Sequence, residues 1–289
     1  MTLSVPRPWG ALVAAIVIAG GIVLAVQSLA ARLPMPGDAG QARLFDAGFT
    51  LLLFGLLGGC GLVLALRHRR AGGLVGPWPL AMAGLGAAIG LGGLFAAFAY
   101  ARIAGVAVSV PDTGAGAGAL LLGTVATIVQ TGGEEIYFRG WLQRALGDAW
   151  GPVAALLVTA IVFASLHLLG GARAPLSLVN LLLGGLLFGL LAERSGGIAA
   201  STAAHLSWNW SEQLLLGLDP NPGTGSFGAL FDHDLIGAAL WGGSPEGLNA
   251  SVAVTLVMAA LLLPLATWRR GAAGPSERPV GLGPDAISR

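Results

Sequence analysis

Two adjacent carboxylates, with an arginine four residues beyond the second, stand in the apolar stretch "TGGEEIYFRGWLQ", residues 131–143. Glu135 and Arg139 have the i, i+4 spacing that places two side chains on one face of a helix, so they can pair. That pairing leaves Glu134 free. Because ionisable side chains at membrane depth are rare and usually functional, we interpret Glu134 as a candidate general base. Glu135 and Arg139 would support it, with a purely structural ion pair as the alternative.

A histidine in a second apolar stretch is predicted to meet Glu134. His167 closes "FASLH" (163–167), and "DAWGP" (148–152) has the Gly and Pro of a turn. Trp150 lies 16 residues after Glu134 and 17 residues before His167. At about 1.5 Å per helical residue, both stand about 24–26 Å from the turn. An antiparallel helical hairpin therefore places Glu134 and His167 at the same level.

A third apolar stretch, "HLSWN" (205–209), carries His205 and Asn209 at the same i, i+4 spacing. A carboxylate and a histidine can polarise one water as general base and acid. A second histidine and an asparagine can donate hydrogen bonds to an oxyanion. The four side chains are therefore suited to amide hydrolysis without a covalent nucleophile. Hydrogen bonding between helices is the structural alternative for His205 and Asn209.

A metal site is the other chemistry open to these residues. Glu134, His167 and His205 could be the three protein ligands of a catalytic zinc, whose fourth position holds water. The sequence lacks HExxH, the usual two-histidine signature of metalloproteases. We therefore favour water activation without a metal or other cofactor, and keep zinc as the less favoured alternative.

The composition predicts that these residues lie in a membrane. Hydrophobic residues make up 55% of the chain, charged residues 10%, and the mean hydropathy is +0.79. Soluble domains carry about a quarter charged residues. The apolar residues form eight blocks of about the length that crosses a bilayer. We therefore expect an all-α polytopic membrane protein with about eight transmembrane helices, at 10–31, 46–66, 78–101, 118–147, 152–170, 175–193, 197–216 and 250–268.

The chain is predicted to form one membrane domain over 1–268, with its motif core at about 118–216, and a disordered cytoplasmic tail at 269–289. With both termini cytoplasmic, eight arginines fall on the inner side and four on the outer side, in agreement with the positive-inside rule. We expect a multi-pass protein of the cell (inner) membrane. The first span is longer than the apolar region of a typical signal peptide, which favours a retained helix over a cleaved one.

The charge and cysteine content exclude other classes of partner and site. The net charge of +1, without a basic patch, gives no indication of nucleic-acid binding. The single Cys60 excludes an internal disulfide and a zinc site of the CxxC type.

Three motifs together resemble a known family. "EEIYFR" (134–139), "FASLH" and "HLSWN" are similar, in order and spacing, to the EExxxR, FxxxH and HxxxN motifs of the CAAX prenyl endopeptidase family. This family is also called the CAAX protease and bacteriocin-processing family (CPBP), or Abi. The resemblance covers about 130–215 and implies a glutamic-type intramembrane protease within an eight-helix frame.

The resemblance implies a role for each motif residue. Glu134 and His167 would activate water, His205 and Asn209 would form the oxyanion hole, and Glu135 and Arg139 would support the site. The substrate would be a membrane-associated peptide or protein. The lysine-free, Gly/Ala-rich composition suggests a high-GC bacterium. Because prenylated CAAX proteins are not expected there, the resemblance supports a peptidase better than a CAAX-specific enzyme.

Two functions of other classes use the same residues. A proton-coupled transporter could use intramembrane Glu and His as a relay, although internal repeats or paired broken helices would then be expected. A non-catalytic membrane scaffold or immunity protein could keep the motifs for binding.

Several polar residues receive structural interpretations. Glu212 is predicted to lie at the membrane interface rather than in the site, and Asn180 to be packing glue between helices. "FDHD" (231–234) is predicted to be a solvated loop. The surrounding segment, 217–249, lies outside the spans and is a candidate for dipping back toward the membrane.

Overall fold

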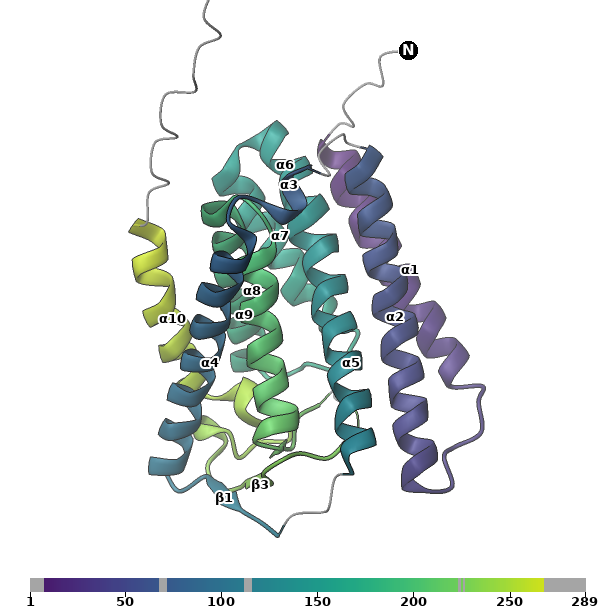
Figure 1. Cartoon of the computed structure of the whole chain (residues 1–289), viewed down its shortest axis with the longest axis vertical. Helices are drawn as coiled ribbons and strands as arrows, with labels where there is room; N and C mark the ends of the chain where they lie inside the picture. The colour runs from purple at the N-terminus through teal and green to yellow at the C-terminus, as the bar shows by residue number, and fades with distance from the viewer. Residues whose placement is uncertain (1–7, 68–71, 112–115, 223–224, 226, 268–289) are drawn as a thin grey trace, which may run out of the picture.

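Helices occupy all eight apolar ranges that the sequence predicts to span the membrane (Figure 1). The computed structural model describes residues 8–67, 72–111, 116–222, 225 and 227–267, so the predicted tail at 269–289 lies outside the described residues. The α-helices are α1 (Pro8–Ala30), α2 (Ala39–Arg67), α3 (Gly72–Val75), α4 (Pro79–Ile103), α5 (Ala117–Glu135), α6 (Gln143–Trp150), α7 (Pro152–Leu166), α8 (Pro175–Ser195), α9 (Ala199–Trp210) and α10 (Val252–Thr267).

Four helices of the described chain, α1, α2, α4 and α8, are long and apolar enough to cross a membrane by themselves. The helices α7 and α10 are apolar but shorter. The predicted fourth and seventh spans each combine an α-helix with a π-helix: α5 continues into η1 (Ile136–Leu142), and α9 continues into η2 (Ser211–Leu215). The all-α class is confirmed, and the number of membrane crossings stays a prediction.

The predicted turn between the fourth and fifth spans is present. Helix α6 ends at Trp150, Gly151 adopts a positive φ of 82°, and Pro152 begins α7. The positive φ of Gly151 favours glycine, and proline is common at the first position of a helix, so the two residues end one helix and start the next. Helix α7 then ends at Leu166, four residues before the predicted end of that span, so His167 caps its C-terminus.

A small three-stranded sheet lies at one end of the bundle (Figure 1), and the sequence analysis did not predict it. Strand β1 (Ala107–Ser109) pairs antiparallel with β3 (His233–Leu235), and β3 pairs parallel with β2 (Leu218–Asp219). The interpretation of 231–234 as a solvated loop was therefore wrong for His233 and Asp234, which belong to β3, although Phe231 and Asp234 are exposed. The Nδ1 of His233 donates a 2.7 Å hydrogen bond to the Leu216 carbonyl, and the ring packs edge-on against Phe98.

The same segment holds two short 3-10 helices, η3 (Ala239–Trp241) and η4 (Gly247–Ala250). It is tied to the bundle by polar contacts at the start of α8. One carboxylate oxygen of Glu246 accepts hydrogen bonds from the backbone N–H groups of Arg173 and Ala174, at 2.8 and 2.7 Å. The Asn180 amide donates to the carbonyls of Asn249 and Ser251 at 2.9 and 2.8 Å, so Asn180 is confirmed as packing glue.

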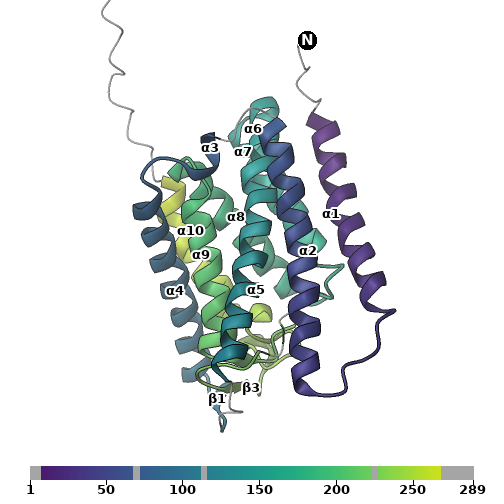
Figure 2. The same cartoon turned by 45° about the vertical axis from the view of Figure 1, so that its right-hand side comes forward.

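Helix α5 lies between two hydrophobic clusters and packs against both α2 and α9 (Figures 1 and 2). One cluster joins α4, α8, α9 and α10, and the other joins α1, α2, α7 and the region from η1 to α6. Helix α5 begins beyond β1, whereas α9 runs from its contact with α3 toward β2. The two helices are therefore antiparallel.

Helix α1 is part of the packed body. The Tyr137 hydroxyl donates a 2.8 Å hydrogen bond to the Ala15 carbonyl, and Trp9 packs edge-on against Trp150. Helix α1 therefore packs against η1, the π-helix that carries Arg139.

Glycines set how closely α4 approaches α9, the helix that carries His205. A Cβ added at Gly90 would overlap the Ala204 carbonyl and the Ser207 hydroxyl, whereas a Cβ at Gly92 would meet nothing within 4 Å. Small residues at such crossings let two backbones approach and gain packing energy in a membrane, where the hydrophobic effect is absent.

We predict that Gly90→Ala destabilises the protein by about 1–3 kcal/mol, the usual cost of overpacking. Gly92→Ala, two residues away on the same helix, serves as the control and should unfold as wild type does. Thermal unfolding of both variants in one detergent measures the difference. Equal midpoints for both variants would show that the α4–α9 contact is not tight.

Candidate active site

His205 bridges the two adjacent carboxylates. Its Nδ1 lies 3.1 Å from Oε1 of Glu135, and its Nε2 lies 3.5 Å from Oε2 of Glu134. All three side chains are buried, and the imidazole stacks on the Phe188 ring with centroids 4.4 Å apart. The histidine that the sequence assigned to the oxyanion is thus also a direct partner of both glutamates.

The predicted pair of Glu135 and Arg139 is confirmed. Arg139 Nη1 lies 2.8 Å from Glu135 Oε1, and Nη2 donates a 3.0 Å hydrogen bond to the Gly185 carbonyl of α8. The guanidinium also lies over the Phe163 ring at 4.6 Å. Arg139 is 1% exposed, so its charge is balanced by protein rather than by water. Glu135 therefore holds both Arg139 and His205.

A second side-chain contact of the same kind joins α6 to α8, one turn beyond the contact of Arg139 with Gly185. The Gln143 amide donates a 2.9 Å hydrogen bond to the Gly189 carbonyl, four residues beyond each member of the Arg139–Gly185 contact. A Cβ at Gly185 would press on Ala160, and a Cβ at Gly189 would press on Gln143 itself. Gly189 thus makes room for Gln143, and Gly185 makes room for the approach of α7.

Two of the three motif-bearing helices, α5 and α9, continue into π-helix within or just after their motif. The segment η1 begins at Ile136, next to Glu135, and η2 begins at Ser211, two residues after Asn209. π-Bulges inside α-helices occur frequently at functional sites. The wider turn redirects the following side chains, and it has no signature in the residue pattern that could have predicted it.

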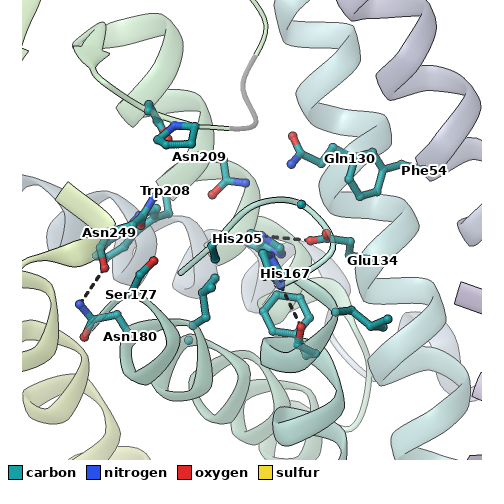
Figure 3. A pocket seen from close by; sticks show the side chains of 18 of the residues that line it. Phe54, Gln130, Glu134, His167, Ser177, Asn180, His205, Trp208, Asn209 and Asn249 are labelled. Atoms are coloured by element: carbon teal, nitrogen blue, oxygen red, sulfur yellow. Dashed lines mark hydrogen bonds and ion pairs between the residues drawn. The ribbon is translucent and has the colours of Figure 1, made fainter. Parts of the chain in front are cut away.

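A cavity of about 330 Å³ contains the predicted catalytic side chains (Figure 3). Glu134, His167, His205 and Asn209 all line it. Its walls come from α1, α2, α5, α7, α8, α9 and α10, from the π-helices η1 and η2, and from the segment that follows η2. The cavity extends toward the sheet end of the bundle, where Gln27, Ser177 and Asn249 also line it.

His167 has one ring nitrogen engaged by the backbone. Its Nδ1 lies 2.8 Å from the Phe163 carbonyl oxygen. Because a carbonyl only accepts, Nδ1 carries the hydrogen, and a neutral ring then keeps its lone pair on Nε2. The antiparallel hairpin brings His167 and Glu134 to one cavity, with His205 beside them (Figure 3).

Glu212 and Gln130 are among the further polar residues that line the cavity, and neither was predicted to belong to it. Glu212 is 3% exposed and lines the cavity from η2, so the prediction that it lies outside the site was wrong. Gln130 lies on α5, four residues before Glu134, and also lines the cavity. The i, i+4 spacing to Glu134 is the signal that could have identified Gln130.

The donor set for zinc, with Glu134, His167 and His205 as ligands, is constrained by these contacts. Both ring nitrogens of His205 meet carboxylates, so a metal at Nε2 would displace the contact with Glu134. Among the residues that the structure describes, no group of three His, Cys, Asp or Glu side chains is placed to hold a metal ion.

The motif-bearing part of the chain matches a family model. Residues 116–211 match the Rce1-like family, described as Type II CAAX prenyl endopeptidase Rce1-like. This match confirms the resemblance over these residues and identifies the family as one of peptide hydrolases. The chain matches no curated protein and no solved structure.

The buried pair of Glu135 and Arg139 leads to a stability prediction. Arg139→Met should destabilise the protein by about 3–5 kcal/mol, because Glu135 keeps its charge in a buried place without its cationic partner. Adding Glu135→Gln should recover much of the loss. Unfolding of the single and double variants, compared as a double-mutant cycle, measures the coupling. Additive losses would contradict a coupled ion pair.

Proposed function

We propose that this protein is an intramembrane endopeptidase that hydrolyses a peptide bond near the membrane surface. The observation that carries the proposal is the position of Glu134, a buried carboxylate that lines the cavity, contacts His205 and shares the cavity with His167. The Rce1-like match over residues 116–211 agrees with this activity. The substrate would be a membrane-associated peptide or protein.

We further propose that eight helices cross the cell membrane, with both termini in the cytoplasm. The start of α1 and the end of α10 lie at the same end of the bundle, as an even number of crossings requires (Figure 1). The count of arginines along the sequence places that end inside. The sheet end, toward which the cavity extends, would then face outward.

In the proposed mechanism, one water lies between Glu134 and His167. Glu134 takes a proton from the water, His167 Nε2 orients it, and the water oxygen adds to the scissile carbonyl carbon. The carbonyl π electrons move to the oxygen and create an oxyanion. The protonated Glu134 then delivers its proton to the leaving nitrogen as the C–N bond breaks. The products are a new carboxyl group and a new amino group.

The charges around Glu134 suit this proton transfer. Two carboxylates and one guanidinium leave one negative charge, and protonated His205 would bring the sum to zero. A buried cluster without net charge avoids the cost of an uncompensated ion. When Glu134 takes the proton from water, its attraction for the Nε2 hydrogen of His205 falls. That hydrogen can then be shared with the oxyanion, together with the amide of Asn209.

We propose that the reaction needs no metal. The donor set supports this, because the sequence lacks HExxH and no group of three His, Cys, Asp or Glu side chains among the described residues is placed to hold a metal ion. Cleavage by the purified protein should continue at the wild-type rate after treatment with a strong chelator. Loss of cleavage on chelation, with recovery on adding zinc, would establish a metal enzyme.

Glu134→Gln should preserve the fold and abolish cleavage, because the amide cannot accept the proton from water. Mass spectrometry of new protein termini in cells that carry wild type or variant tests this. Glu193→Gln, the same substitution outside the cavity lining, is the control and should give wild-type termini. Both variants are compared at equal abundance in the membrane.

Two outcomes would contradict the peptidase. Termini that are identical in wild type and Glu134→Gln, with the cellular phenotype preserved, would favour a non-catalytic scaffold or immunity protein. Identical termini combined with proton-linked flux into liposomes that depends on Glu134 would favour a transporter.

A further inference from the structure

The contact between Glu134 and His205 fixes the register of α5 against α9. The two helices run antiparallel, and these side chains meet at 3.5 Å. Gln130 lies one turn before Glu134, and Asn209 lies one turn after His205. In an antiparallel pair, both steps lead the same way along the bundle. Gln130 on α5 and Asn209 on α9 therefore lie at the same level along the bundle, on opposite walls of the cavity.

A second contact supports this register. The Trp210 indole donates a 3.0 Å hydrogen bond to the Thr124 hydroxyl, so the later residues of α9 meet the earlier residues of α5. Figure 3 shows Gln130 and Asn209 on the same side of the Glu134–His205 contact. Both residues line the cavity.

Neither amide is held by the protein. Within the part of the chain that the structure describes, the side chains of Gln130 and Asn209 have no hydrogen-bond partner. Other polar side chains nearby are engaged: His205 meets two carboxylates, and His167 meets a carbonyl. The two amides are thus neutral donors available, at this level of the cavity, to a group that enters it.

The oxyanion of peptide hydrolysis needs such donors. His205 Nε2 faces Glu134 before the reaction and is shared with it, so it can serve the oxyanion only after Glu134 is protonated. An amide N–H that is free from the start can stabilise the charge as it develops, without first breaking another contact.

We propose that Gln130 is a catalytic residue whose side-chain N–H donates to the oxyanion from α5, opposite Asn209 on α9. This inference rests on the proposed peptidase function and adds a residue outside the three motifs. Gln130 neither gains nor loses a proton. It stabilises the negative charge on the former carbonyl oxygen until the C–N bond breaks and the carbonyl re-forms.

Gln130→Met tests the proposal, because methionine keeps the length of the side chain and removes the donor. Gln41→Met, the same substitution in the exposed first turn of α2, is the control. The probe is an internally quenched peptide that spans a cleavage site mapped by the comparison of protein termini. For Gln130→Met we expect kcat to fall about a hundredfold, as for other oxyanion donors, with KM nearly unchanged. Gln41→Met should match wild type.

A second measurement separates catalysis from folding. A phosphonamidate version of the same peptide imitates the tetrahedral intermediate, and a reduced-amide version imitates the uncleaved substrate. Gln130→Met should weaken phosphonamidate binding by the same factor as kcat/KM and leave reduced-amide binding unchanged.

Two results would overturn this role while leaving the peptidase intact. The first is a wild-type kcat in Gln130→Met. The second is equal weakening of both analogues, which would mark Gln130 as a binding or structural residue. If no cleavage site depends on wild-type protein, the proposed function itself fails, and the role of Gln130 fails with it.

Discussion

The site depends on burying four ionisable groups together. Glu134, Glu135, Arg139 and His205 are each nine-tenths buried or more, in a chain whose helices are built for lipid. An isolated charge there would be very costly, so each group needs a partner. Glu135 meets this need by contacting both Arg139 and His205. Glu134 contacts His205 at the longer distance of 3.5 Å, within the part of the chain that the structure describes, and keeps access to the cavity.

The rest of the fold brings these groups together from separate helices. The adjacent glutamates lie at the end of α5, Arg139 lies in η1, and His205 lies on α9. Helix α8 completes the cluster through the Gly185 carbonyl. Glycines at the contacts of α4 with α9 and of α8 with its neighbours let the backbones approach closely enough for these short polar contacts. The close helix packing that the small, apolar residues allow is therefore what brings the charged side chains of the site together.

Local spacing predicted the parts of the site that depend on a single helix or hairpin. The Glu135–Arg139 pair follows from an i, i+4 interval, and the turn at Gly151 follows from its Gly and Pro. Contacts between helices distant in the sequence were not predictable in this way. The position of His205 between two glutamates depends on the register of α5 against α9, which no interval in the sequence specifies.

Other features were missed for similar reasons. The π-helices leave no residue pattern, and the three strands are two or three residues long, too short for an alternating pattern. Glu212 follows an apolar span and resembles an interface residue by position alone, although helix packing buries it beside the cavity. Gln130 carries no charge, so its place in an apolar span is not costly enough to mark it as functional.

Direct attack by a water that Glu134 activates is the central claim, and a single-turnover experiment in water enriched in the heavy oxygen isotope tests it. Excess enzyme would cleave a mapped peptide once, and mass spectrometry would locate the label. We predict one heavy oxygen in the new carboxyl group of the peptide, no label in Glu134 and no covalent adduct on the protein. Label in the Glu134 side chain, or an enzyme-bound peptide adduct, would contradict the account and identify a covalent mechanism.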